Sequence, residues 1–336
     1  MKSKKLFPVF MFLILSLVFL FACSKESPVT PPPTNTPTAT LTATIDSTSS
    51  ITPTSTPTAT LTATASATST ITVTPTSTHV IVTFPDSNLE SAIRTAISKP
   101  SGDITEDDLS VLTTFFDDSG SITNISGIEH CKNLTNLGIQ YSGSITDISM
   151  LSTMTQLTSL DLYGATGVTD ASALSTLTNL QTLNLGHGGN YPVALTGIST
   201  IASLTLLTTL ELMDRDIDNT EAALLSSLVN MFILNLSRNS FDNTSFMTNM
   251  SSLGYLSCNE TAISDLSGLS GLLNLTSVSL SGCTSLTDIS SLVTNAAAGG
   301  LGNGDNVYLT GDTLSAQGVT DVGTLRTTYS VTVTYP

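Results

Sequence analysis

The sequence contains no tryptophan, and only 11% of its 336 residues are charged. Basic residues are especially scarce, because 10 Lys and Arg stand against 26 Asp and Glu, which gives a formal net charge of -16 at pH 7. Three of the ten, Lys2, Lys4 and Lys5, lie in the first five positions. A surface of this sign repels nucleic acid, so the composition excludes nucleic acid as a partner.

Motifs that carry enzymatic chemistry are missing as well. The three histidines, His79, His130 and His187, show no paired metal-ligand spacing. No G-x-S-x-G is present, and the glycine run at 299–304 lacks the Lys and Ser or Thr that a phosphate-binding loop needs. We therefore expect that the protein is not an enzyme and binds no cofactor.

One stretch imitates a calcium loop. "DRDIDN" (214–219) alternates three aspartates, but Asn219 stands where the loop needs glycine, and Leu225 stands where it needs glutamate. We interpret the stretch as a solvated acidic turn and expect no metal site.

Cysteine is also rare, with four in the chain. Apart from Cys23, the remaining Cys131, Cys258 and Cys283 form an odd set, which argues against a disulfide framework. We predict that these three are buried thiols.

The amino terminus predicts export and anchoring. Lys2, Lys4 and Lys5 precede an apolar run at 6–22, so residues 1–22 are typical of a signal peptide. "LFAC" (20–23) resembles the lipobox of bacterial lipoproteins, which implies that Cys23 is lipidated and anchors the protein in a membrane. Ser24, in place of Asp, is compatible in such lipoproteins with transfer to the outer membrane, where we expect the protein to be exposed at the surface. Phe21 departs from the usual small residue, and an uncleaved signal anchor is the alternative.

Residues 23–79 follow as the lipidated cysteine and a stalk. Positions 24–79 contain 21 Thr and 8 Pro among 56 residues, and "TPTATLTAT" occurs twice. So few apolar side chains cannot offset the entropy of ordering the chain. We predict a disordered, extended linker that holds the folded part away from the membrane.

Residues 80–112 read as an amino-terminal cap. "VIVTF" (80–84) predicts a short strand, and "SNLE" (87–90) predicts a helix with Ser87 as N-cap and Glu90 as its partner. "TEDD" (105–108) begins a second short helix. A cap is required because the first unit of a repeat array would otherwise expose its core.

Residues 113–293 repeat one apolar frame every 22 to 27 positions. The spacing L-x-x-L-x-L at this period is the leucine-rich-repeat signature, and it predicts a curved α/β solenoid with a parallel sheet on its concave face. The core positions are Leu134/Leu137/Ile139, Leu157/Leu160/Leu162, Leu180/Leu183/Leu185, Leu207/Leu210/Leu212, Met231/Leu234/Leu236, Leu253/Leu256/Cys258 and Leu275/Val278/Leu280, and Phe115 precedes them in the same series.

The repeats and the cap motif "FPDSNLESAI" make residues 80–336 resemble the internalin-like leucine-rich-repeat proteins of bacteria. Residues 294–336 hold an interrupted last repeat and a segment similar to the terminal cap of such surface proteins. The resemblance implies a solenoid that binds another macromolecule. Asn usually stands three positions after the last core leucine, but here only Asn239 does, with Cys283 as a common alternative. We expect looser turns at Ser142, Ala165, Gly188, Arg215 and Thr261.

The residues between the core leucines point outward and form the candidate contact face. Exposed aromatic and apolar residues beside carboxylates are common interface anchors, and the alternative is a solvated sheet face with incidental aromatics. The predicted protein-binding residues are Phe116, Asp161, Tyr163, Glu211, Met213, Ile233, Tyr255 and Tyr308, with Tyr163, Met213, Ile233 and Tyr255 as a central apolar group.

Together these features predict a monomeric, non-enzymatic protein-binding module on a membrane-anchored lipoprotein, acting in cell-surface interaction or adhesion with a host or cell-surface protein. The alternatives are an envelope structural or assembly protein with a partner in the same cell, and a carbohydrate-binding protein.

Overall fold

The structure is a computed structural model that describes residues 79–189 and 191–336. The predicted signal peptide, the lipidation site Cys23 and the stalk up to residue 78 lie outside the described residues. Residues 79–336 form one compact unit. Within the part of the chain that is described, no helix combines the length and the apolar character needed to cross a membrane.

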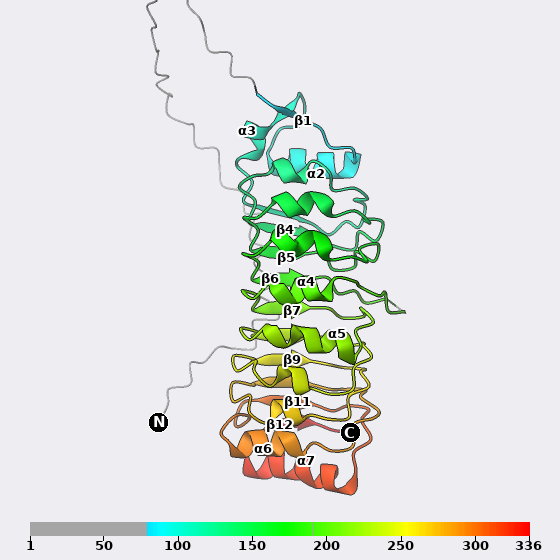
Figure 1. The fold of residues 1–336 in the computed structure, drawn as a ribbon, viewed down its shortest axis with the longest axis vertical. Coiled ribbons are helices and arrows are strands. Elements are labelled where there is room, and N and C mark those ends of the chain that lie inside the picture. Colours follow the sequence, from blue (N-terminus) through cyan, green and yellow to red (C-terminus); the bar gives the residue numbers. More distant parts are fainter. Residues whose placement is uncertain (1–78, 190) are drawn as a thin grey trace, which may run out of the picture. The chain divides into compact units, whose positions relative to one another are not determined.

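A ten-stranded parallel sheet runs the length of this unit, with its strands in sequence order. Figure 1 shows the strands stacked from the blue-green to the red end of the unit. The strands are β3 (Thr114–Asp117), β4 (Asn136–Ile139), β5 (Ser159–Asp161), β6 (Thr182–Asn184), β7 (Thr209–Glu211), β8 (Ile233–Asn235), β9 (Tyr255–Ser257), β10 (Ser277–Ser279), β11 (Asn306–Tyr308) and β12 (Thr332–Thr334).

The register of the sheet confirms the predicted repeat frame. The middle core residues pair in sequence order from Phe115 with Leu137 to Leu256 with Val278, without a slip. The other core leucines are also buried, and they belong to one continuous cluster. One repeat alone could not cover both of its apolar sides, so burial depends on the neighbouring repeats.

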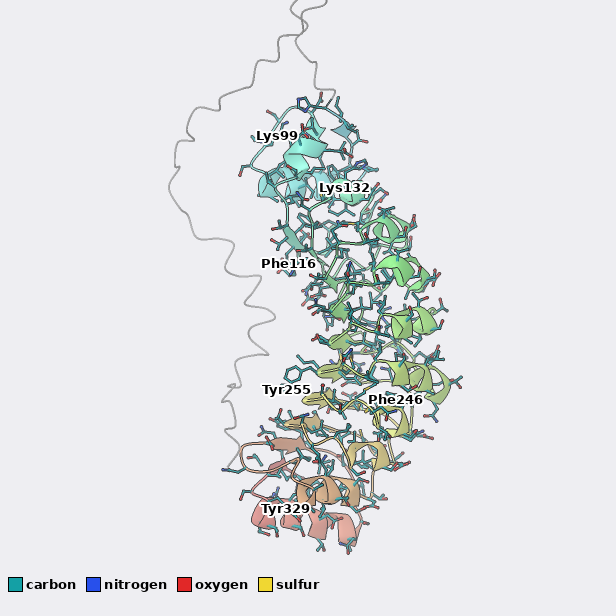
Figure 2. All side chains as sticks on the ribbon, turned by 60° about the vertical axis from the view of Figure 1, so that its left-hand side comes forward. Lys99, Phe116, Lys132, Phe246, Tyr255 and Tyr329 are labelled. Atoms are coloured by element: carbon teal, nitrogen blue, oxygen red, sulfur yellow. The ribbon has the colours of Figure 1, made fainter. Side chains whose placement is uncertain are left out.

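Short helices return the chain on the side opposite the strands, as Figure 2 shows, where Phe246 lies among the helices and Phe116 and Tyr255 lie on the strand side. The α-helices in this row are α4 (Ile198–Ser203), α5 (Asn219–Leu224) and α6 (Ser290–Ala297), and the 3-10 helices are η2 (Ile128–His130), η3 (Ser149–Thr153), η4 (Ser172–Thr176), η5 (Leu225–Ser227), η6 (Ser245–Met247) and η7 (Ser267–Leu269). The sheet therefore forms one face of a leucine-rich-repeat solenoid.

The amino-terminal end combines α2 (Ser87–Ala96), α3 (Glu106–Leu109) and an antiparallel pair, β1 (Ile81–Val82) with β2 (Ile104–Thr105). The predicted N-cap Ser87 is wrong by one residue, because the side chain of Asp86 accepts the backbone N–H groups of Asn88 and Leu89. The carboxylate of Asp86 also accepts the backbone N–H of Thr123 at 2.7 Å, so it joins the cap to the first repeat. At the other end α7 (Ala316–Thr328) packs beside β12.

Asn239 occupies its turn as the repeat pattern predicts. Its side-chain nitrogen donates to the carbonyls of Leu212 and Leu236, each at 2.9 Å, and its oxygen accepts the backbone N–H of Arg215 and of Ile217. Asn239 therefore satisfies the backbone of two successive turns, which would otherwise be buried without partners.

Arg215 satisfies the buried backbone carbonyls of neighbouring turns that lack asparagine. Its guanidinium is fully buried and donates to the backbone carbonyls of Leu185, Val168 at 3.0 Å and Ala165 at 3.4 Å. Burial lowers the pKa of Arg215 to about 10, so it remains charged at pH 7. The expected looseness at Ala165 is therefore wrong, because a long side chain from two repeats away supplies the missing donor.

The three predicted buried thiols are confirmed. Cys131, Cys258 and Cys283 are free and buried. Cys283 fills the turn position of its repeat, where its thiol donates to the carbonyl of Cys258 at 3.1 Å. Burial raises the pKa of Cys131 to about 12 and that of Cys258 well above its ordinary value, so both are neutral thiols.

Candidate functional site

The predicted contact residues lie on the strand side of the solenoid, spread along the sheet. Phe116 belongs to β3 and Tyr308 to β11, so these two are eight strands apart. The ring of Phe116 lies over the backbone of Gly138, where an added Cβ would come within 2.5 Å of it. Phe116 and Tyr308 therefore mark opposite ends of the face, and the structure does not bring them together.

The four residues of the central apolar group separate into two clusters. Ile233 and Tyr255 are register partners at the beginning of β8 and β9, and Phe232 packs edge-on against Tyr255 with ring centroids 5.4 Å apart. Phe232 is 38% exposed and extends this cluster. We name Phe232, Ile233 and Tyr255 the entry cluster, because they lie where the strands begin.

The second cluster lies beyond the ends of the strands. Tyr163 follows the end of β5, and its ring meets that of Tyr141 edge-on at a centroid distance of 5.5 Å. Met213 follows β7 on the same side. β5 and β9 are four strands apart, roughly 19 Å at the usual strand spacing. Tyr163 and Tyr255 are therefore two separate anchors on one surface.

Two carboxylates lie between these clusters. Asp161, Asn184 and Glu211 are successive register partners on β5, β6 and β7. Asp161 accepts a hydrogen bond of 2.6 Å from the side chain of Gln140. Burial raises the pKa of Asp161, and burial together with the charge of Asp161 raises the pKa of Glu211. Both carboxylates thus lie in an environment that disfavours their negative charge, which a cationic group from a partner would relieve.

A row of charged residues borders the sheet where the chain leaves each strand. Asp214, Arg238 and Glu260 occupy the same position in three successive repeats, and all three have left-handed backbone conformations, with φ of 63°, 61° and 54°. Other repeats place Gly164 and Gly282 there, with φ of 79° and 78°. Tyr141 occupies the same position in another repeat with φ of 58°. A left-handed conformation costs a residue with a side chain roughly 1–2 kcal/mol, so charged and aromatic residues alike are held at this border at the expense of backbone strain.

Asp214 is the most unusual member of this row. It is 1% exposed, and its Oδ1 lies 3.2 Å from Nε of Arg238. Its Oδ2 has no hydrogen-bond partner among the described residues. Burial raises the pKa of Asp214, and the charge of Arg238 offsets part of that effect.

The glycine-rich loop of the 27-residue repeat crosses this border with its described residues 186–189 and 191–193. Arg238 Nη2 donates to the carbonyl of Gly189 at 2.7 Å, and the backbone N–H of Val193 donates to the carbonyl of Asp214 at 2.9 Å. His187, in the loop, is 2% exposed and accepts the N–H of Gly189 at Nδ1. Its proton is then on Nε2, which is buried without a partner in the described part of the chain. Burial lowers the pKa of His187, so the ring is neutral at pH 7.

Two hollows lie at this border. One, of ≈ 230 Å³, is lined by the Tyr141–Tyr163 pair and by the loop at His187. The other, of ≈ 280 Å³, is lined among others by Asp214, Asp216, Arg238 and Glu260. In residues 79–189 and 191–336, no three His, Cys, Asp or Glu side chains are grouped so as to hold a metal ion.

The sequence reasoning missed this border row. Its signal was present, because the position two residues after the last core leucine holds glycine in several repeats and a charged residue in three successive ones. The interpretation of "DRDIDN" as a solvated acidic turn is wrong for its first two residues, because Asp214 and Arg215 are buried. Asp214 lies at the border, and Arg215 fills the core of the turn.

Comparison with known proteins agrees with this geometry: the chain is a leucine-rich-repeat protein of the internalin-like type. It is similar to the crystal structure of internalin C2 from Listeria monocytogenes, with 29% sequence identity and a TM-score of 0.57 over 69% of this chain and 94% of that one. Internalin InlF of the same organism matches with 23% identity and a TM-score of 0.44 over 78% and 95%. No family model and no curated protein sequence matches the chain. The internalin-like fold supports a protein-interaction module.

Proposed function

We propose that residues 79–336 bind another protein through the strand face of the solenoid, with Tyr163 and Tyr255 as separate anchors. The observation that carries this proposal is the pairing of exposed aromatic clusters with half-buried carboxylates on an otherwise small and polar sheet. Aromatic residues of this kind dominate binding energy in protein interfaces, because they bury large area at low entropic cost. The remaining proposed contacts are Phe116, Asp161, Glu211, Met213, Ile233 and Tyr308.

We further propose that lipidation at Cys23 anchors the chain in the outer membrane and that the Thr/Pro-rich stalk presents the solenoid at the cell surface for adhesion. The "LFAC" motif and the composition of residues 24–79 support this part. Catalysis has no place in the proposal, because the site offers interface anchors and no nucleophile paired with a base.

The location is tested by protease treatment of intact cells. Release of the 79–336 fragment from whole cells is the expected result. Protection until the outer envelope is opened would contradict surface display and would direct the search to partners inside the envelope.

The binding face is tested with a partner recovered from an extracellular screen. Tyr163→Ala combined with Tyr255→Ala should weaken binding at least about tenfold, as truncation of interface anchors does. Tyr191→Ala is the matched control, because Tyr191 is 81% exposed on the loop and lies outside the two clusters. Equal affinities of the double variant and the unaltered protein would eliminate the strand face as the interface.

A further inference from the structure

We infer that His187 and Asp214 form an acid-sensitive switch beside the anchor Tyr163, because one proton taken up by this pair removes the acceptor that holds the backbone N–H of Gly189. The inference rests on the proposed protein-binding function and adds the regulation of one of its two anchors by pH. The surface concerned is the hollow of ≈ 230 Å³ that is lined by Tyr141, Tyr163 and the loop at His187.

The two buried side chains of the switch present acceptors to each other. Nδ1 of His187 lies 4.0 Å from Oδ2 of Asp214, and the two residues are 2% and 1% exposed. Arg238 lies at the other carboxylate oxygen, Oδ1, at 3.2 Å, while Oδ2 has no hydrogen-bond partner within the described residues. Two buried acceptors without a proton between them are unfavourable, so a proton added to either group meets an acceptor in the other.

The lone pair of Nδ1 is already used by the loop. In the neutral ring Nδ1 accepts the backbone N–H of Gly189 at 3.1 Å, and a ring nitrogen has one lone pair for this purpose. If His187 takes up the proton, Nδ1 becomes a donor. If Asp214 takes up the proton, its Oδ2 competes as a donor for the same lone pair. Either uptake therefore removes the hydrogen bond of Gly189.

The charged groups around the ring of His187 come from the turns of the next two repeats. Asp214 and Arg215 follow β7, and Arg238 follows β8. Burial lowers the pKa of His187 below its ordinary 6.5, and the charges of Arg215 and Arg238 act in the same direction, whereas the charge of Asp214 opposes them. Tyr163, which lines the same hollow, stays neutral in acid, because burial raises its pKa from 10.0.

The pKa of Asp214 moves in the other direction. Burial raises it above its ordinary 3.8, and the charge of Glu260, which follows β9, adds to this effect. The charges of Arg238 and Arg215, and that of His187 when protonated, oppose it. The two pKa values thus approach each other between 3.8 and 6.5, so we expect the pair to take up one proton in this interval.

The segment that loses its hydrogen bond forms part of the hollow at Tyr163. Gly188 and Gly189 line the hollow, and a Cβ built on Gly188 would lie 2.7 Å from Oη of Tyr163, so this segment is close to the anchor. Arg238 Nη2 holds the carbonyl of Gly189 at 2.7 Å, so the peptide that carries the N–H of Gly189 can turn while the next one stays in place. The proton should therefore change the surroundings of Tyr163 and leave the distant repeats unaltered.

The test is an NMR titration of the full chain, labelled with ¹⁵N and ¹³C, between about pH 7.5 and about pH 4. The ring nitrogens of His187, the amide of Gly189 and the ring of Tyr163 should change with one common midpoint between 3.8 and 6.5. The hydrogen-exchange protection of the Gly189 amide, referred to the intrinsic rate at each pH, should fall about fivefold, as expected for the loss of one hydrogen bond.

Three variants separate the switch from general effects of acid. His187→Gln removes the ring for which the proton competes, so the protection of the Gly189 amide should no longer change across the interval. Asp214→Asn removes the charge that favours the protonated ring, so the midpoint should move to lower pH, and asparagine tolerates the left-handed backbone at this position. His130→Gln is the matched control, because His130 pairs with Glu106 at the amino-terminal end of the array, and it should leave the transition unchanged.

The switch is overturned if the Gly189 amide keeps its protection across the interval, if the same transition persists in His187→Gln, if Asp214→Asn leaves the midpoint in place, or if His130→Gln abolishes the transition. A transition of Gly189 that leaves the ring signals of Tyr163 unchanged would overturn the regulation of the anchor. None of these results depends on a protein partner, so failure of the switch is distinguishable from failure of the proposed strand-face interaction.

Discussion

Replacing Asp312 with asparagine should stabilise the carboxyl-terminal repeats at neutral pH and have little effect in acid. Asp312 lies three positions after the core residue Leu309, where the repeat pattern favours asparagine, and it is 7% exposed. Its Oδ1 accepts the backbone N–H of Cys283 at 2.7 Å, while Oδ2 has no partner among the described residues. Asn239, at the equivalent position, uses its nitrogen to donate to two carbonyls.

The magnitude follows from the pKa. Burial raises the pKa of Asp312 from its ordinary value of 3.8 to about 6. The folded protein therefore binds this proton more tightly than the unfolded chain, so the stability of the folded state falls as pH rises from 3.8 through about 6. At 1.36 kcal/mol for each pKa unit, the ionised carboxylate costs about 3 kcal/mol above that interval and almost nothing below it. Asp312→Asn removes this cost, so its gain should be about 3 kcal/mol at pH 8 and less than about 1 kcal/mol at pH 3.5.

The assay must report on the carboxyl-terminal repeats, because repeat arrays can open piecewise. Hydrogen exchange of the Cys283 amide, which donates to Asp312, gives the local free energy of opening at each pH, and urea unfolding gives the global value. Asp288→Asn is the control, since Asp288 is exposed in the repeat of Cys283 and accepts hydrogen bonds from the backbone N–H and the hydroxyl of Ser290. A gain of equal size at pH 3.5 and pH 8, or a loss at pH 8, would refute the reasoning.

Two further predictions concern the turns. Arg215→Met should lower the free energy of unfolding, measured with urea, by about 3 kcal/mol, because the carbonyls of Ala165, Val168 and Leu185 lose their donor. The control Lys132→Met changes an exposed position and should alter this free energy by less than about 0.5 kcal/mol. Similar values for the two variants would contradict the bridging role of Arg215. Gly268→Ala should lower the free energy of unfolding by about 1–3 kcal/mol, because the new Cβ would lie 1.9 Å from the carbonyl oxygen of Thr244. Gly271→Ala, whose new Cβ would have nothing within 4 Å, should be neutral or slightly stabilising. Thermal melting of the two variants separates steric overlap from a general effect of replacing glycine.

The strand frame was predictable because the apolar period is a local property of the sequence. Side chains alternate along a strand, so the L-x-L spacing alone predicts which residues face the core. Stacking of the repeats then fixes the register between neighbouring strands. The N-cap of α2 was not predictable to the residue, since Asp86 and Ser87 are both favourable caps. The choice depends on Thr123, 37 positions away, whose N–H and hydroxyl both bind the carboxylate of Asp86.

The candidate site was predictable as a surface and not as a set of contacts. The outward columns select Ile233 and Tyr255, which begin β8 and β9, and Tyr163 and Met213, which follow β5 and β7, but the division into two clusters depends on neighbouring rings. Phe232 and Tyr141 pack edge-on against Tyr255 and Tyr163, and neither was included in the columns that the repeat pattern selects.

The departures from the repeat pattern are concentrated in residues 186–260, and they depend on one another. Arg215 supplies donors to the two preceding repeats, which frees the turn positions Ala165 and Gly188 from the need for asparagine. The longer loop of this repeat is held at its described residues by two hydrogen bonds, from the N–H of Val193 to the carbonyl of Asp214 and from Arg238 to the carbonyl of Gly189. Arg215, which stabilises the core of these turns, thus directly follows Asp214, the buried carboxylate at the border, in the sequence. Because one turn carries both roles, loss of Arg215 should disturb the contact of Asp214 with Arg238 as well as the stability of the array.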